Sequence, residues 1–124
     1  MNNLRFAKTH EWISAEGKVG ISDHAQKEIT DVVFVELPAA GKSVQKEGEA
    51  CTIESVKAAF PIYAPVAGQI VSVNDKVGQN PELVNKSPYE DGWLFQIKMD
   101  SAADLEKLMT EAQYQEFLKS EAHH

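Results

Sequence analysis

A single lysine between two β-rich runs is the feature that most constrains the fold of this chain. Lys57 follows a strand-like run over residues 50–56 and precedes a second apolar stretch that begins at Ile62. Two such runs joined by a few small residues are typical of a β-hairpin. The pattern therefore predicts a hairpin with Lys57 at its tip, in solvent between small side chains, without an ion-pair partner and within reach of a modifying enzyme.

The first two-thirds of the sequence has the pattern of short β-strands separated by turn residues, rich in β-branched and aromatic side chains. A faint internal repeat, in which residues 38–41 resemble residues 65–68, suits two related β halves that meet at the hairpin. The expected strands are Val19–Ile21, Val32–Leu37, Ala50–Val56, Ile62–Ala64, Gln69–Asn74 and Trp93–Met99.

Helical signals interrupt and then follow these strands. Ser22 or Asp23 can cap a short helix that runs to about Ile29, and the Asn-Pro pair at residues 80 and 81 can start a brief turn through residue 85. Apolar spacings of three and four, behind two capping-box patterns, predict C-terminal helices over residues 101–119. We expect these helices to pack on the β core.

Composition limits the classes of function. At 124 residues, the chain has the length of one domain, residues 1–124, and no apolar run long enough to span a membrane. Its net charge of −7 argues against nucleic-acid binding, which requires basic residues to neutralise phosphates, and suits docking onto basic protein surfaces. Cys51 is the only cysteine, so an intrachain disulfide is excluded, and we expect it to be buried. The four histidines have no metal-like spacing, so no metal site is expected.

Several segments of the chain resemble the H-protein family of the glycine cleavage system, whose members are lipoyl carriers. The resemblance spans roughly residues 4–118 in the expected order. Its segments are His10-Glu11-Trp12 and residues 20–26, 32–38, 53–73, 83–85 and 87–94. It implies a mainly β fold, the lipoyl/biotinyl-type barrel-sandwich hybrid, with short helices and a C-terminal helical segment.

The same resemblance implies what Lys57 would do. Its Nζ would carry lipoic acid through an amide bond, which removes the charge of the lysine and lengthens it into a tether. The protein itself would not be an enzyme. Its partners would be a PLP-dependent glycine decarboxylase, an aminomethyltransferase, the flavin enzyme dihydrolipoamide dehydrogenase, and a lipoate ligase or lipoyl/octanoyl transferase. A monomer would suit such a shuttle best, and the N-terminal sequence favours a cytoplasmic location, or a mitochondrial one if a presequence has been removed.

Further site residues follow from the resemblance. Glu11 and His24 are expected to line a cleft that shelters the loaded arm, where a carboxylate would suit a cationic aminomethyl group. The alternatives are a solvated carboxylate and a histidine bonded to backbone. Glu54 and the residues around the lysine, which are Ser55, Val56 and Ala58, are expected to be read by the lipoylating enzyme.

Two positions depart from the family pattern. Pro61 stands where the family has an acidic residue four positions after the modified lysine, so the role of that residue in positioning the arm cannot be transferred. Proline also fixes its own φ and favours an extended conformation at Phe60. Thr30 stands where a glycine is usual, which suggests a different exit from the preceding helix.

Other functions remain open from the sequence. A biotinyl domain usually has methionines on both sides of its lysine, and the lipoyl domains of 2-oxo acid dehydrogenases lack the His10-Glu11-Trp12 segment and C-terminal helices. An H-like relay protein that donates lipoyl or octanoyl groups to other proteins is hard to distinguish by sequence. A Schiff-base enzyme would need Lys57 in a desolvated or cationic pocket, and no sequence neighbour provides one.

Overall fold

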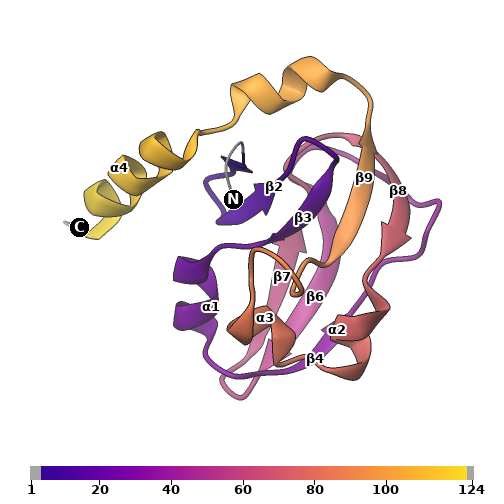
Figure 1. The fold of residues 1–124 in the computed structure, drawn as a ribbon, viewed down its shortest axis with the longest axis vertical. Helices are drawn as coiled ribbons and strands as arrows, with labels where there is room; N and C mark the ends of the chain where they lie inside the picture. Colours follow the sequence, from indigo (N-terminus) through magenta and orange to yellow (C-terminus); the bar gives the residue numbers. More distant parts are fainter. Residues whose placement is uncertain (1–3, 123–124) are drawn as a thin grey trace.

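The structure is a computed structural model that describes residues 4–122; His123 and His124, on which no function was placed, lie outside the described residues. Two β-sheets face each other, with helices at their margins (Figure 1). The strands are β1 (Arg5–Phe6), β2 (Glu11–Ile13), β3 (Lys18–Ile21), β4 (Val32–Glu36), β5 (Ser43–Val44), β6 (Glu49–Ser55), β7 (Ala59–Tyr63), β8 (Gly68–Val73) and β9 (Phe95–Met99).

The sheets are antiparallel throughout the described residues. One has the order β1-β2-β3-β9-β8-β5 and the other β4-β6-β7. The residues that follow the two repeat copies pair with each other, with Ser43 opposite Gln69. The expected strand at residues 62–64 begins three residues earlier, at Ala59, and the short strands β1, β2 and β5 were not predicted. The mainly β fold class is confirmed.

Alternating apolar side chains from both sheets form the main core. Ile13, Val19, Ile53 and Ile70 are all fully buried there, and Cys51 is buried as expected. Burial raises the pKa of the Cys51 thiol to about 12, so this thiol is protonated and unreactive.

A smaller cluster lies outside the main core. Leu4, Phe6, Trp12 and Tyr114 form it. The indole of Trp12 packs directly on Gly20 of β3, where a Cβ would lie 2.8 Å from the ring. Only a glycine accommodates this approach, so the glycine fixes Trp12 in place and with it the β2 segment that carries Glu11.

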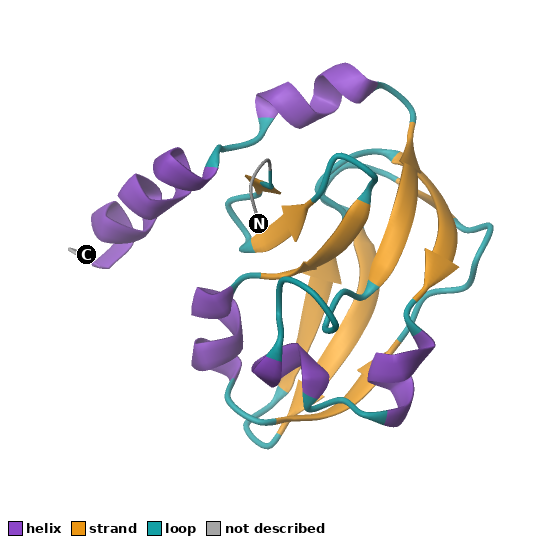
Figure 2. Cartoon of the chain, in the orientation of Figure 1, coloured by secondary structure: helices purple, strands orange, loops and turns teal. Residues whose placement is uncertain are grey.

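The helices lie at the ends and edges of the sheets (Figure 2). They are α1 (Asp23–Ile29), α2 (Asp75–Gln79), α3 (Leu83–Lys86), the 3₁₀ helix η1 (Ala102–Lys107) and α4 (Glu111–Ala122). Ser22 caps α1, because its Oγ accepts from the amide of Ala25 at 3.1 Å. The helical turn expected from Asn80 and Pro81 is present, because the amides of Leu83 and Val84 donate to their carbonyl oxygens at 3.1 Å. The capping box expected at Ser101 was wrong, since Ser101 makes no side-chain capping bond to η1.

Thr30 ends α1 in a conformation that usually requires glycine. Its φ is 66°, in the region that β-branched residues avoid. Two contacts hold it there. The Thr30 amide donates to the carbonyl oxygen of Gln26 at 3.1 Å, and the Nδ2 of Asn85 donates to the carbonyl oxygen of Thr30 at 2.9 Å. The threonine thus adopts a φ that glycine reaches more easily, and a different exit from α1 stays a prediction.

The C-terminal helix α4 runs past the N-terminal strands, as Figure 1 shows. The ring of Tyr114 stacks on Phe6 of β1 with centroids 4.4 Å apart. The predicted capping box at its start is present: Thr110 Oγ1 accepts from the amide of Gln113 at 3.2 Å, and Gln113 Oε1 accepts from the amide of Thr110 at 2.9 Å.

Replacing Thr110 by alanine is expected to destabilise α4 by about 1 kcal/mol, because one amide loses its cap. Hydrogen exchange of the α4 amides should accelerate by roughly fivefold. Thr110→Ser keeps the hydroxyl and should exchange like the parent protein. Equal exchange in all three proteins would show that this cap is not formed in solution.

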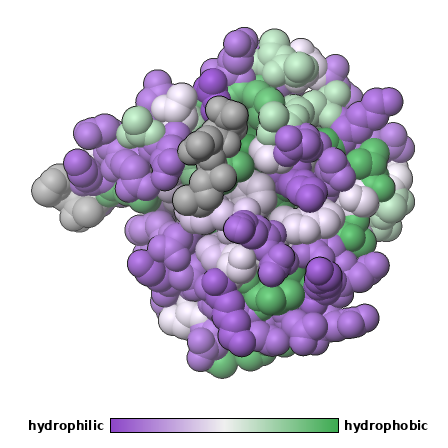
Figure 3. Space-filling view, viewed as in Figure 1, coloured by the Kyte–Doolittle hydropathy of each residue, from purple (hydrophilic) through white to green (hydrophobic). Residues whose placement is uncertain are grey.

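Hydrophilic residues cover most of the face in Figure 3, and hydrophobic residues form separate patches on it. Among the described residues, no helix has the length and apolar character needed to cross a membrane.

Candidate functional site

Lys57 lies at the exposed tip of the β6–β7 hairpin. The turn is held by Ser55, whose Oγ accepts from the amides of Lys57 at 3.0 Å and Ala58 at 3.3 Å. The amide of Val56 donates to the carbonyl oxygen of Asp31 at 2.9 Å, which ties the tip to the chain before β4. The tip is thus a fixed turn that presents an exposed lysine.

A cavity of about 300 Å³ lies beside this lysine. Its walls come from the turn before β2, from α1 and from the β6–β7 hairpin. They are formed by Thr9, His10, Glu11, Ile21, Ala25, Glu28, Ile29, Lys57, Phe60, Pro61 and Ile62. The Lys57 Nζ lies 3.5 Å from the carbonyl oxygen of Glu28, so its side chain leans toward α1 and has no carboxylate partner among the described residues.

Glu11 is a buried carboxyl group in the wall of this cavity, only 1% exposed. It accepts a hydrogen bond from the Thr9 hydroxyl and another from the amide of Tyr63 at 3.1 Å. Burial raises its pKa to about 7, although both hydrogen bonds act in the opposite direction. The expectation of a solvated carboxylate is therefore wrong, and Glu11 joins the edge of β7 to the other sheet.

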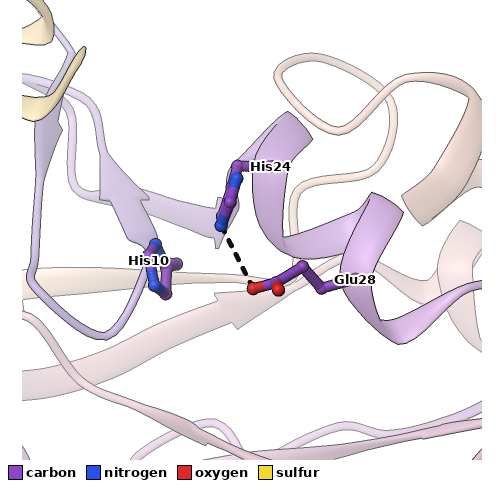
Figure 4. A group of neighbouring side chains, drawn as sticks. All are labelled: His10, His24 and Glu28. Atoms are coloured by element: carbon purple, nitrogen blue, oxygen red, sulfur yellow. Dashed lines mark ion pairs between the residues drawn. The ribbon is translucent and has the colours of Figure 1, made fainter. Parts of the chain in front are cut away.

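His24 does not line the cavity, although its neighbours on α1 do. Its ring lies 5.0 Å from the ring of His10, and its Nε2 lies 3.1 Å from the carboxylate of Glu28 (Figure 4). The alternative expectation of a histidine bonded to backbone also differs from this arrangement. His24 is therefore placed at the margin of the cavity, where it contacts two residues that do line it.

The side chain of His10 contacts helix α4. Its Nδ1 lies 2.7 Å from the hydroxyl of Tyr114, which in turn bonds to Ser22 at 2.7 Å. Partial burial lowers the pKa of His10, and the carboxylate of Glu121, 3.5 Å from Nε2, acts in the opposite direction. The C-terminal helix, the cap of α1 and the cavity wall are thus connected through one network.

The remaining predicted residues surround the tip. Glu54 is exposed on β6 opposite Ala59, and Val56 is 67% exposed. Val33 and Phe34, which are also exposed, lie on β4, which pairs with this end of β6. Together they make an accessible surface with one acidic and three apolar side chains.

Pro61 lines the cavity from β7, an edge strand. Proline is tolerated on an edge because a missing amide there breaks no ladder bond. Pro61 brings no charged group to the cavity. Glu11 and Glu28 are the only acidic residues among those that line the cavity.

The sequence patterns did not indicate that Thr9, His10 and Glu28 line the cavity. Thr9 and His10 directly precede Glu11, and Glu28 lies one helical turn beyond His24. That i, i+4 spacing on a capped helix was the available signal. The approach of His10 to α1 depends on the tertiary fold, so no sequence pattern could have revealed it.

Two facing sheets, one of which contains a hairpin that presents a lysine, define the class: a lipoyl/biotinyl-type carrier fold. Residues 4–121 match the family described as glycine cleavage H-protein. A solved glycine cleavage system H protein from Mycobacterium marinum superposes with a TM-score of 0.84, at 27% identity and with 98% of each chain covered.

Proteins of similar sequence belong to the same family. The glycine cleavage system H protein of Beijerinckia indica is 51% identical, covering 97% of this chain and 99% of that protein, and the one from Thermotoga maritima is 48% identical, covering 98% and 100%. The chain therefore belongs to the glycine cleavage H-protein family, the lipoyl carriers of the glycine cleavage system. It is a carrier and not an enzyme.

Proposed function

We propose that Lys57 is the residue to which the lipoyl group is attached, and that residues 1–124 form one lipoyl-carrier domain. The observation that carries this proposal is the position of Lys57 on an ordered, exposed turn beside a cavity of about 300 Å³. A lysine there is accessible to an attaching enzyme, and the cavity is close enough to receive what it carries.

The residues present fit a lipoyl group. Ile21, Ile29, Phe60 and Ile62 provide an apolar wall for an alkyl chain, and Glu11 provides a carboxyl group within it. When bound, the lipoyl group supplies a dithiolane that can be reduced, can accept an aminomethyl group and can be reoxidised. The chain's own contribution is to hold the tip rigid and to exclude water from one side of the cavity.

Glu11 is suited to neutralise a cationic group in the cavity. Its pKa of about 7 means that a nearby positive charge would favour its ionised form. The ion pair would be poorly screened, because the carboxyl group is buried. His24 has an indirect role in this proposal, since it contacts His10 and Glu28 at the cavity margin.

The partners in this proposal are a PLP-dependent glycine decarboxylase, an aminomethyltransferase and dihydrolipoamide dehydrogenase, with a lipoate ligase or lipoyl/octanoyl transferase for attachment. The net charge of −7 favours docking onto basic surfaces of these enzymes. A cytoplasmic location is also part of the proposal. An Arabidopsis thaliana relative, 46% identical, is named a mitochondrial protein, so cell fractionation should test the location directly.

Peptide mass spectrometry of the protein isolated from its own cell tests the attachment. A lipoyl increment confined to the peptide that contains Lys57 is expected. A lysine that remains bare after incubation with lipoate, ATP and a lipoate ligase would refute the proposal.

Replacing Glu54 by alanine is expected to slow lipoylation several-fold without unfolding the protein. Glu54 is exposed, so its loss removes little packing, but it lies on the strand that ends at the tip. The rate of mass increase with lipoate ligase is the measurement, and Glu49→Ala, at the other end of β6, is the matched control. Equal rates for both variants and the parent protein would exclude recognition of Glu54.

A further inference from the structure

We propose that His10, His24 and Glu28 form a binding site for one divalent metal ion of the zinc type. The proposal is independent of lipoyl attachment. It runs against the expectation from histidine spacing in the sequence, which considered the histidines alone.

The geometry is already close to a metal site. One ring nitrogen of each histidine and one carboxylate oxygen of Glu28 all lie within 4.8 Å of one another. Figure 4 shows the three side chains converging, His24 and Glu28 from α1 and His10 from the turn before β2. In a tetrahedral zinc site the ligand atoms are roughly 3.4 Å apart. The His24 and Glu28 side chains are 38% and 64% exposed, so they are free to make the remaining movement of up to about 1.4 Å.

His10 is oriented as a metal-binding histidine usually is. Such a histidine uses one ring nitrogen for the metal, and its other nitrogen bonds to a neighbouring group that fixes the ring. Here Nδ1 bonds to the Tyr114 hydroxyl at 2.7 Å, so Nε2, which lies 3.5 Å from the Glu121 carboxylate, is the nitrogen that would bind the metal in place of that contact. The φ of His10 is 78°, a backbone conformation that few non-glycine residues adopt. The amide of Ser22 donates to its carbonyl oxygen at 2.9 Å and holds it there.

The donor set selects the class of ion. Two imidazole nitrogens and one carboxylate oxygen suit zinc and similar first-row divalent ions, whereas calcium and magnesium prefer oxygen ligands. Three protein ligands leave a fourth position open. Because His10 and Glu28 also line the cavity, that open position is at the cavity margin.

A surface ion pair does not account for the whole arrangement. The contact of His24 with Glu28 alone is an exposed i, i+4 pair, worth a few tenths of a kcal/mol. It gives no reason for a second imidazole, fixed by Tyr114, to lie 5.0 Å from the first. A metal ion is a partner that uses a neutral nitrogen from each ring at once.

Calorimetric titration with Zn²⁺ tests the site. The protein is the full, unmodified chain with His123→Ala and His124→Ala, so that the terminal histidines cannot contribute. One Zn²⁺ per chain is expected to bind. His24→Ala and Glu28→Gln should each weaken binding at least about tenfold, and the imidazole nitrogen resonances of His10 and His24 should shift on addition of Zn²⁺.

Asp23→Asn is the matched control for Glu28→Gln. It removes one negative charge from the same helix, and Asp23 pairs with Lys27 and is not part of the cluster. Its affinity for Zn²⁺ should stay within about twofold of the parent value, because Asp23 provides no ligand atom and the effect of an exposed charge is screened by solvent and salt. The proposal is overturned if binding disappears with the terminal histidines, if His24→Ala binds like the parent, or if Asp23→Asn loses as much as Glu28→Gln.

Discussion

Replacing Lys57 by arginine is expected to abolish lipoyl attachment while leaving the fold unchanged. A guanidinium group stays protonated and is not an acyl acceptor, whereas a lysine amine can form the amide. The Lys57 side chain is exposed at the hairpin tip, and the turn is held through backbone amides and Ser55. Arginine preserves the charge and those amides, so no stability should be lost.

The measurement is intact mass after incubation with lipoate, ATP and a lipoate ligase. The parent protein should gain one lipoyl increment, and the variant should stay at background. Lys46→Arg is the matched control, because Lys46 is exposed in the turn before β6. This control should be modified like the parent protein. A lipoyl increment on the Lys57→Arg variant would place the attachment on another lysine.

The second large effect concerns Glu11 and pH. The pKa of its carboxyl group is raised from 4.5 to about 7 in the folded protein, chiefly because burial disfavours the charged form. The folded state therefore holds a proton that the unfolded state releases between pH 4.5 and 7. In that window the free energy of unfolding falls as the pH rises, by about 3 kcal/mol in total. The contribution is fully present below pH 4.5 and lost above pH 7.

Glu11→Gln should remove this dependence. The glutamine amide keeps an oxygen that can accept from the Tyr63 amide, and it has no charge to desolvate. Relative to the parent protein, the variant should therefore gain about 3 kcal/mol in free energy of unfolding between pH 4 and pH 8. Urea unfolding at a series of pH values measures this difference. Glu16→Gln, at an exposed position, should follow the parent curve, and parallel curves for Glu11→Gln would contradict the raised pKa.

The longer strands were predictable because they show β-branched, apolar patterns of sufficient length. The strands β4, β6, β8 and β9 each have five residues or more. The strands β1 and β5 have two residues each, too few for any alternation to be recognised. The helix α2 escaped prediction because Gly78 lies inside it, and glycine is a poor helix former.

The position of Lys57 at a turn was predictable because it depends on local sequence. Lys57 lies at a turn because the small residues Ser55 and Ala58 surround it, and that signal is contained in four residues. The burial of Glu11 depends on β7, fifty-two residues further along the chain, whose Tyr63 amide it accepts. The approach of His10 to Tyr114 depends on α4, at a separation of 104 residues. Such contacts are set by tertiary packing, which single-sequence patterns do not encode.

The outer edge of β7 has a consequence for self-association. Exposed edge strands are templates for strand addition, because their free amides can pair with another chain. Pro61 has no amide to offer, and the amide of Tyr63, two residues further along, is already taken by Glu11. The edge of the hairpin that presents Lys57 thus has few donors left for a neighbouring molecule. Concentrated protein is therefore protected against aggregation through this edge, and the tip stays accessible.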